Sequence, residues 1–366
     1  MTMRVLVVGG GINGLLTTRA LAQAGAEVVL VERGRIGQEA SWAGGGIVSP
    51  LYPWRYPPAV TALARWAQAA YPALAEALMA ETGIDAELTT SGLLFLDAPD
   101  ARDAQAWAQQ QGVACSSWQQ AVLHQQWPGL AKDVAHGVFL PEVAQVRNPR
   151  LLKALRAALV QMPKVTLREQ AEVVQVSSQP SPQIRLVSGE VITADAVVLT
   201  GGAWTQSLLR DLGLSLPVRP IKGQMQLYQL APGALTTMIL RNGHYVIPRR
   251  DGLVLCGSTL EDTGFDKSVT ETAHEKLRAA AISLWPALAD ADCVAQWAGL
   301  RPASPNGIPF IGEVPNQPGL WVNAGQFRNG LVLAPASARL LCDQLLRRSP
   351  VMDAAPYQLL PGSSLQ

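Results

Sequence analysis

Cysteine is scarce in this 366-residue sequence, and its four copies lie far apart. They stand at Cys115, Cys256, Cys293 and Cys342, and no two of them form a CxxC pair. Zinc clusters need closely spaced thiols and disulfide frameworks need a regular set of cysteines, so the sequence favours neither. Scattered thiols suit a reducing compartment, and we expect a cytoplasmic protein.

The sequence also lacks net charge and long hydrophobic runs. Its 29 basic and 28 acidic residues leave a formal charge of +1, which gives no overall field to attract nucleic acid or an anionic membrane. Three glycines interrupt the apolar run 5–8 near the N-terminus, and no apolar stretch of about 18 residues follows. We therefore expect no nucleic-acid partner, no membrane association and a soluble protein.

Histidine is equally sparse. The four histidines, at positions 124, 136, 244 and 274, do not have the spacing of metal ligands, so we expect no metal site. Only His244 adjoins a residue of functional interest, Tyr245, and alternation along a strand would send their side chains to opposite faces.

The N-terminal residues are typical of a dinucleotide-binding unit. Residues 5–8 form a short apolar run, residues 12–24 have helical spacing, and residues 28–31 form a second apolar run. This strand-helix-strand order predicts a βαβ unit and an α/β fold. The sequence GGGING at its first turn satisfies GxGxxG with Gly9, Gly11 and Gly14.

Each residue of that motif has a physical role in holding a pyrophosphate. Gly9 allows the tight turn, Gly11 lets the phosphates approach the backbone, and Gly14 permits close packing of helix against strand. Glu32 ends the second strand, where its carboxylate can accept hydrogen bonds from a ribose and repels a 2′-phosphate. The unit therefore predicts NAD or FAD and disfavours NADP.

The rest of the chain predicts a second, sheet-based domain. Residues 224–230, 245–248 and 253–257 read as antiparallel strands, the last two joined by a turn at 250–252. Glycines also follow the second strand, at 44–46, and a later one, at 201–202. A last strand at 320–323 leads through further glycines into a helix at 331–346. Glycines at several strand ends favour a long, extended dinucleotide.

Six segments carry a resemblance to a known family. They are the N-terminal unit, SWAGGGI, VVLTGGAW, YVIPR, WAGLRP and AGQFRNGLVLAP. Together they resemble the FAD-dependent D-amino-acid oxidase superfamily, and within it the glycine oxidases of thiamine biosynthesis. The resemblance implies a glutathione-reductase-like FAD-binding Rossmann domain (1–55, 145–215 and 295–350) interleaved with an antiparallel-sheet substrate-binding domain (56–144 and 216–294). We expect residues 351–366 to form a loose tail.

The resemblance also implies the residues of the site. Arg301, Arg328 and Tyr245 match substrate-binding positions, with Arg301 on the substrate carboxylate. The residues expected to hold a non-covalent FAD are Gly9, Gly11, Ile12, Asn13, Gly14, Glu32, Arg33, Ala40, Ser41, Gly44, Gly45, Gly46, Ile47, Val173, Gly299, Gln326, Phe327, Arg328, Asn329, Gly330, Leu331 and Val332.

The implied reaction is the oxidation of a small amine by hydride transfer to flavin N5. Because FAD carries the redox step, we expect no essential catalytic side chain. The partners are glycine, sarcosine or a small D-amino acid, molecular oxygen and, by resemblance, other copies of the chain in a homotetramer. Leu260, where the family commonly has Met, leaves the choice of substrate open. A dehydrogenase with a quinone acceptor and a non-catalytic flavin sensor remain the alternatives.

Overall fold

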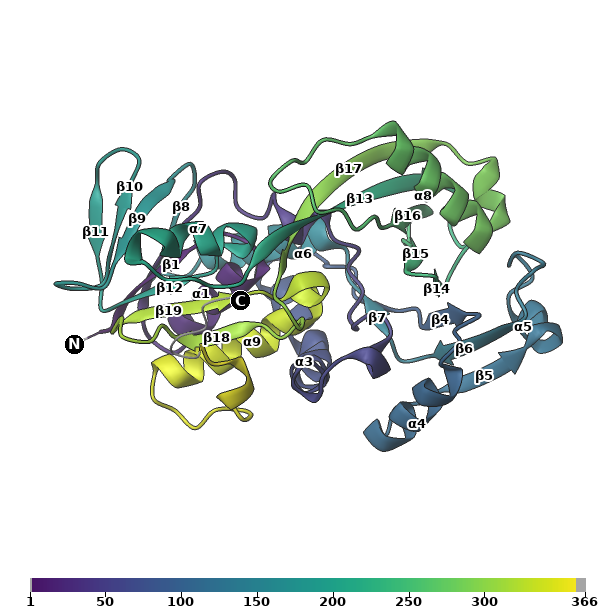
Figure 1. Cartoon of the computed structure of the whole chain (residues 1–366), viewed down its shortest axis with the longest axis horizontal. Coiled ribbons are helices and arrows are strands. Elements are labelled where there is room, and N and C mark those ends of the chain that lie inside the picture. The colour runs from purple at the N-terminus through teal and green to yellow at the C-terminus, as the bar shows by residue number, and fades with distance from the viewer. Residues whose placement is uncertain (1, 360–366) are drawn as a thin grey trace.

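The computed structural model, which describes residues 2–359, contains two large β-sheets (Figure 1). The first has six strands in the order β18-β19-β12-β1-β2-β8. Its central strands run parallel and only the edge strand β18 is antiparallel. The strands are β1 (Arg4–Val8), β2 (Glu27–Val31), β8 (Val165–Arg168), β12 (Ala196–Leu199), β18 (Phe310–Glu313) and β19 (Leu320–Ala324).

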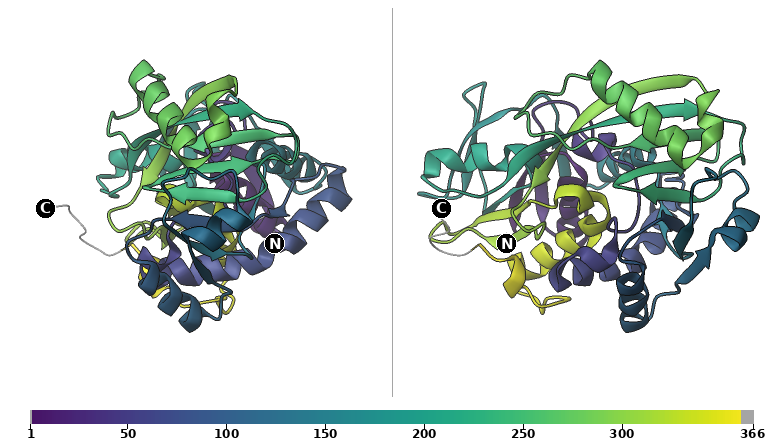
Figure 2. Two further views of the ribbon diagram at one scale, coloured as in Figure 1. Left: turned by 90° about the vertical axis from the view of Figure 1, so that its right-hand side faces the viewer. Right: turned by 45° about the vertical axis from the view of Figure 1, so that its right-hand side comes forward.

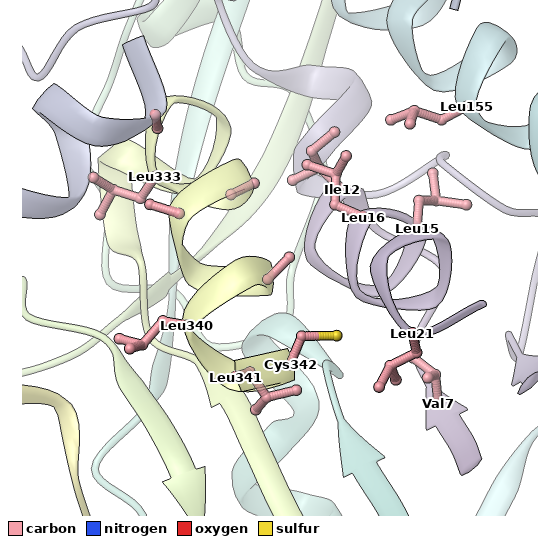
Figure 3. Packing of buried hydrophobic residues seen from close by; sticks show 14 of the residues in the cluster. Val7, Ile12, Leu15, Leu16, Leu21, Leu155, Leu333, Leu340, Leu341 and Cys342 are labelled. Carbon is pink, nitrogen blue, oxygen red and sulfur yellow. The ribbon is translucent and has the colours of Figure 1, made fainter. Parts of the chain in front are cut away.

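Apolar side chains cover both faces of this first sheet, which is why its strands are uniformly hydrophobic. Alternation along β1 sends Val5 and Val7 to one face, and Leu6 and Val8 to the other. Helices α1 (Ile12–Gln23), α3 (Pro58–Thr82), α6 (Asn148–Val160) and α9 (Gly330–Leu345) contribute to the first core. Figure 3 shows part of this core, with side chains of α1, α6 and α9 and with Cys342 among them.

The opposite core lies under a small three-stranded antiparallel sheet. This small sheet consists of β9 (Val173–Ser177), β10 (Gln183–Leu186) and β11 (Val191–Thr193), and it lies at one end of the molecule (Figure 1). Helix α7 (Thr205–Leu209) lies beside β9. Strands β8 and β12, before and after this small sheet in the chain, belong to the first large sheet instead.

The second large sheet has eight strands in the order β17-β13-β16-β15-β14-β4-β6-β5. Only the β14–β4 pair is parallel. The strands are β4 (Leu93–Leu96), β5 (Ser116–Gln119), β6 (His136–Leu140), β13 (Arg219–Gln229), β14 (Met238–Arg241), β15 (His244–Pro248), β16 (Leu253–Gly257) and β17 (Cys293–Ala303). Helix α8 (Glu271–Leu284) packs on it, on the side away from α3 and α9 (Figure 2). The predicted 245–257 hairpin is confirmed.

Short elements connect these layers. They are α2 (Ala40–Ala43), β3 (Thr89–Thr90), α4 (Ala101–Gln111), α5 (Gln120–Gln126), β7 (Ala144–Gln145) and the 3-10 turns Pro53–Arg55, Gly202–Trp204, Arg210–Leu212, Pro286–Ala289, Phe327–Asn329 and Ala355–Tyr357. The longest helix, α3, has 25 residues. Within residues 2–359, no helix combines the length and the apolar character needed to cross a membrane.

Two elements pack differently from what the expected domain boundaries imply. Helix α3, assigned in advance to the substrate domain, packs against α9 and α6 in the first core, and β17 belongs to the second sheet over its whole length. The domain boundaries remain a prediction. The loose tail is corrected as far as the structure describes it, because Tyr357 is 2% exposed and its hydroxyl donates to the carbonyl of Ala59 at 2.7 Å. Residues 360–366 lie outside the described residues.

The Tyr71 hydroxyl replaces a backbone hydrogen bond that α9 lacks. Pro335 lies inside this helix and has no N–H to donate to the carbonyl of Leu331, four residues earlier. The hydroxyl of Tyr71, on α3, donates to that carbonyl at 2.6 Å, and Tyr71 is 1% exposed. Helix α3 therefore supports the start of α9, which follows the expected FAD-contacting loop.

We expect Tyr71→Phe to lower the free energy of unfolding by about 1–3 kcal/mol, because it leaves the Leu331 carbonyl buried without a donor. Tyr357→Phe is the matched control. Its acceptor, the carbonyl of Ala59, lies four residues before Leu63, which supplies an ordinary helical N–H, so a smaller loss is expected. Urea unfolding of both variants measures the difference, and equal losses would contradict this role of Tyr71.

Candidate active site

A cavity of about 300 Å³ lies where the carboxyl ends of β1, β2 and β12 meet β13 and β17. Open α/β sheets bind ligands at this edge, outside the carboxyl ends of their strands. Its wall includes Glu32, which follows β2, Val173 from the three-stranded sheet, and Tyr245, Gly299 and Arg301 from the second large sheet. The cavity therefore joins the nucleotide-binding edge to the antiparallel sheet.

Most residues expected at the site line this cavity. They are Gly9, Gly11, Ile12, Asn13, Glu32, Arg33, Ala40, Ser41, Gly44, Gly45, Gly46, Ile47, Val173, Tyr245, Gly299, Arg301, Gln326, Phe327, Arg328, Gly330 and Leu331. The structure does not place Gly14, Asn329 or Val332 on its wall. Val332 belongs to the first core, and a side chain at Gly14 would meet the Gly9 carbonyl and Thr200, as its packing role requires.

The N-terminus of α1 faces the cavity with its amides partly engaged. Ser41 Oγ accepts a hydrogen bond from the amide of Ile12 at 2.9 Å. The carboxylate of Glu32 accepts from the amide of Gly10 at 2.7 Å and from that of Gly34 at 2.9 Å. These contacts fix the glycine turn and the end of β2, and the helix N-terminus offers positive potential to a pyrophosphate.

Three buried polar atoms in residues of the wall are suited to binding a polar cofactor. Asn13 Oδ1, Asn148 Oδ1 and Gln326 Oε1 are buried and have no hydrogen-bond partner among the described residues. Buried polar groups are nearly always satisfied, so such atoms point to a group that the cavity takes up. Asn148 was not expected from the sequence, although it also holds the loop by donating to the Ser41 carbonyl at 2.7 Å.

Arg249 holds the glycine segment 44–46 in place through hydrogen bonds. Its guanidinium donates to the carbonyl of Gly45 at 2.8 Å, to that of Val146 at 3.0 Å and to Gln145 Oε1 at 2.6 Å. Burial lowers the pKa of Arg249 to about 10, which leaves it charged at neutral pH. The sequence contained this residue in the YVIPR motif, but only the fold shows that it reaches residues about a hundred positions and more away.

Arg301 stands at the other end of the cavity. Its Nη2 donates to Ser258 Oγ at 2.7 Å, and its Nη1 donates to the carbonyls of Thr259 at 3.1 Å and Lys222 at 3.4 Å. All three acceptors are neutral, and no carboxylate of the described residues forms an ion pair with it. Burial, and then the charge of Arg328, lower the pKa of this guanidinium.

The space beside Arg301 is narrow. Tyr245 is 6% exposed and its hydroxyl contacts the Met225 sulfur at 3.5 Å. Leu260, expected to influence the pocket volume, is 59% exposed and is not part of the wall, because the chain turns outward after Ser258 and Thr259. His244 does not line the cavity either, and burial lowers the pKa of its imidazole.

One part of the wall was missed by sequence reasoning. Residues 200–204 follow β12, and Thr200 ties this third strand end to the glycine turn by donating to the carbonyls of Val8 at 3.0 Å and Gly9 at 2.9 Å. The signal was the strand-glycine boundary in VVLTGGAW. It indicated a strand end near the nucleotide, but it could not show which side chains face the cavity.

Comparison with known proteins agrees with this geometry. The sequence profile described as FAD dependent oxidoreductase matches residues 4–344. The chain belongs to the FAD-dependent oxidoreductase family. The chain is 53% identical over 359 residues to a glycine oxidase of Pseudomonas aeruginosa and 50% identical over 358 residues to one of Pseudomonas putida, with 98% of both chains covered each time. A crystal structure of the glycine oxidase of Geobacillus kaustophilus superimposes with a TM-score of 0.93 at 32% identity, covering 99% of this chain and 100% of that one.

FAD is thus the cofactor of this FAD-dependent oxidoreductase, as the glycine motifs predicted without choosing it over NAD. The cavity walls suit it, since they combine an amide-rich helix N-terminus, a carboxylate for ribose and unpartnered polar atoms. FAD supplies a two-electron acceptor, and the fold confirms the predicted combination of a Rossmann-type parallel sheet with a second antiparallel sheet.

We expect Arg249→Lys to raise the FAD dissociation constant about tenfold, because a lysine ammonium cannot reach the three acceptors that the guanidinium holds. Titration of the apoprotein with FAD, followed by flavin fluorescence, measures the change. Arg250→Lys is the neighbouring control, since Arg250 is exposed and binds Asp85 and the 88–89 segment instead of the cavity loop. Equal FAD affinity in both variants would contradict the role of Arg249.

Proposed function

We propose that this enzyme oxidises glycine and other small amines, such as sarcosine and small D-amino acids, with molecular oxygen as the final acceptor. The observation that carries the proposal is the charge of Arg301, which is half-buried in the cavity wall and held only by neutral oxygens. A charge partly withdrawn from water without a counter-ion favours a ligand that brings a carboxylate. The names of the relatives support glycine as that ligand.

The substrate-side residues divide the work of binding. Arg301 presents a planar guanidinium that can bind both oxygens of one carboxylate and stays charged at neutral pH. Arg328 lies on the same wall without an ion pair among the described residues and adds positive charge. Tyr245, with Met225 beside it, limits the room left for a side chain on the substrate. These residues orient the amine, and none of them needs to act as a general base.

FAD, which the glycine turn, Glu32 and the N-terminus of α1 would hold, would supply a two-electron acceptor for the hydride of the substrate Cα, with oxygen as the final acceptor. The protein keeps the carboxylate fixed while the amine becomes an imine. Water then hydrolyses the imine to an oxo acid and ammonia, and oxygen with two protons becomes hydrogen peroxide. For glycine the oxo acid is glyoxylate.

The same resemblance suggests the setting of the reaction. We place the enzyme in the cytoplasm, with FAD held non-covalently, with an imine or glyoxylate product used for the thiazole of thiamine, and with several copies in a homo-oligomer. The scattered cysteines support the compartment. The 53% and 50% identity to glycine oxidases over nearly the whole chain supports the product.

Purified holoprotein is expected to consume oxygen on addition of glycine and to release hydrogen peroxide and ammonia in equal amounts. An oxygen electrode and a peroxidase-coupled assay measure this, with sarcosine and D-alanine run in parallel. Flavin bleaching by glycine without air, with no peroxide in air but rapid reduction of a soluble quinone, would favour a dehydrogenase. Failure of every small amine to bleach the flavin would favour a sensor.

Arg301→Ala is expected to raise the KM for glycine about a hundredfold, since it removes the charged partner of the carboxylate. Gly223→Ala tests the same contact without removing the arginine, because a Cβ at Gly223 would occupy the place of the Arg301 guanidinium. We expect it to raise KM about tenfold while the flavin spectrum stays unchanged. An unaltered KM in both variants would exclude Arg301 as the anchor.

A further inference from the structure

Five side chains from distant parts of the chain form a series of contacts beside the cavity, and the backbone between Phe265 and Lys267 closes this series into a ring. The Arg33 guanidinium lies 3.6 Å from the centroid of the Trp204 ring, and Trp204 stacks on Phe265 with centroids 5.3 Å apart. Lys267 pairs with both carboxylate oxygens of Glu39 at 3.1 Å, and Glu39 pairs with Arg33 at 3.0 Å. The ring therefore joins residues of the first sheet's loops to the segment 261–268.

The segment 261–268 follows the second large sheet and is fixed to it from beneath. Lys222, on β13, is 1% exposed and donates to Asp266 Oδ2 at 2.9 Å and to the Ser268 carbonyl at 3.2 Å. Glu261 bridges Lys222 through its backbone in both directions, at 2.8 and 2.9 Å, and its carboxylate lies 3.3 Å from the ammonium. Asp266 thus anchors the chain directly between the two ring members Phe265 and Lys267.

Exposure distinguishes the ring from ordinary packing. Phe265 is 47% exposed and the Lys267 side chain 45% exposed, so neither residue contributes to a hydrophobic core. Phe265 instead packs on Trp204, at the surface. The three other members, Arg33, Glu39 and Trp204, line the cavity.

The ring stands at one particular end of the cofactor site. Arg33 follows Glu32 directly, and the carboxylate at the end of the second strand is the group that binds the adenosine ribose in this type of fold. Glu172 and Val173 line the same end of the cavity, whereas Arg301 belongs to the substrate side. The ring therefore closes over the adenosine half of the dinucleotide.

We propose that Phe265 and Lys267, with Trp204, form a cross-sheet clasp over the adenosine half of the cofactor and slow its release. The clasp must open before FAD leaves, since its members come from both sheets and close the mouth between them. Its stacked and ionic contacts form only when the segment 261–268 lies against Trp204. The proposal depends on FAD occupying the cavity and not on the identity of the substrate.

The test measures FAD release rather than turnover. In the Phe265→Ala/Lys267→Ala double variant, FAD is expected to dissociate roughly tenfold faster than from the wild type, and from Phe265→Ala alone roughly fivefold faster. Flavin fluorescence rises on release, so dilution of the holoprotein far below its FAD dissociation constant gives the rate. Because both residues are exposed, the variants are expected to fold, and the melting temperature of the apoprotein checks this.

Two controls keep the test specific. Val269→Ala changes another exposed apolar residue just beyond the same segment, outside the ring, and should release FAD at the wild-type rate. Phe265→Tyr keeps an aromatic ring stacked on Trp204 and should release FAD at about the wild-type rate, unlike Phe265→Ala. ADP, which carries the adenosine half alone, should bind the double variant more weakly by a similar factor. Wild-type FAD release by the double variant, equal acceleration by Val269→Ala, or unchanged ADP affinity would each overturn the proposal.

Discussion

The pairing of β13 with β17 is the constraint on which the rest of the site depends. The two strands pair antiparallel along almost their whole length, with Gly223 directly opposite Gly299. A Cβ at Gly223 would meet the Arg301 guanidinium, and one at Gly299 would meet Ala43 at 2.6 Å. These facing glycines create the room in which the arginine lies flat on its own sheet and the first sheet's loop approaches the second. A slip of one residue would place side chains in that space.

The same strand serves two purposes because its side chains alternate. Gly223 and Met225 line the cavity, whereas Lys222, Gln224 and Gln226 are buried on the opposite face, towards α8 and the segment 261–268. Gln224 joins that far side by donating to Glu261 at 3.0 Å and accepting from the Thr270 amide at 3.0 Å. The Lys222 backbone carbonyl meanwhile accepts from Arg301. Arg301, the proposed substrate anchor, and the proposed clasp therefore both depend on strand β13.

The sequence predicted those parts of the molecule that rest on local chemistry. Glycines at strand ends, the GxGxxG turn with Glu32 and the 245–257 hairpin all combine residues that are near in sequence, so periodicity and turn residues revealed them. The contacts of Arg249 with Gly45, and of Tyr71 with the carbonyl left free by Pro335, join positions 204 and 260 residues apart. No local pattern encodes such pairs. The expectation that Leu260 influences the pocket failed for the same reason. The chain turns outward at Leu260 because of the bridge between Lys222 and Glu261, which local sequence does not reveal.

The charges of the cavity finally explain how a small amino acid would be oriented. The acidic residues of the wall are Glu32, Glu39 and Glu172, towards the proposed adenosine end, while Arg301 and Arg328 provide positive charge at the proposed substrate end. A zwitterionic amino acid would therefore enter with its carboxylate towards the arginines. Its amine then finds no carboxylate of the wall close by, and two neighbouring positive charges lower the pKa of an ammonium group. The proposed site would thus favour the neutral amine, whose lone pair is needed for hydride loss from the adjacent carbon, and the proposed reaction needs no side-chain base.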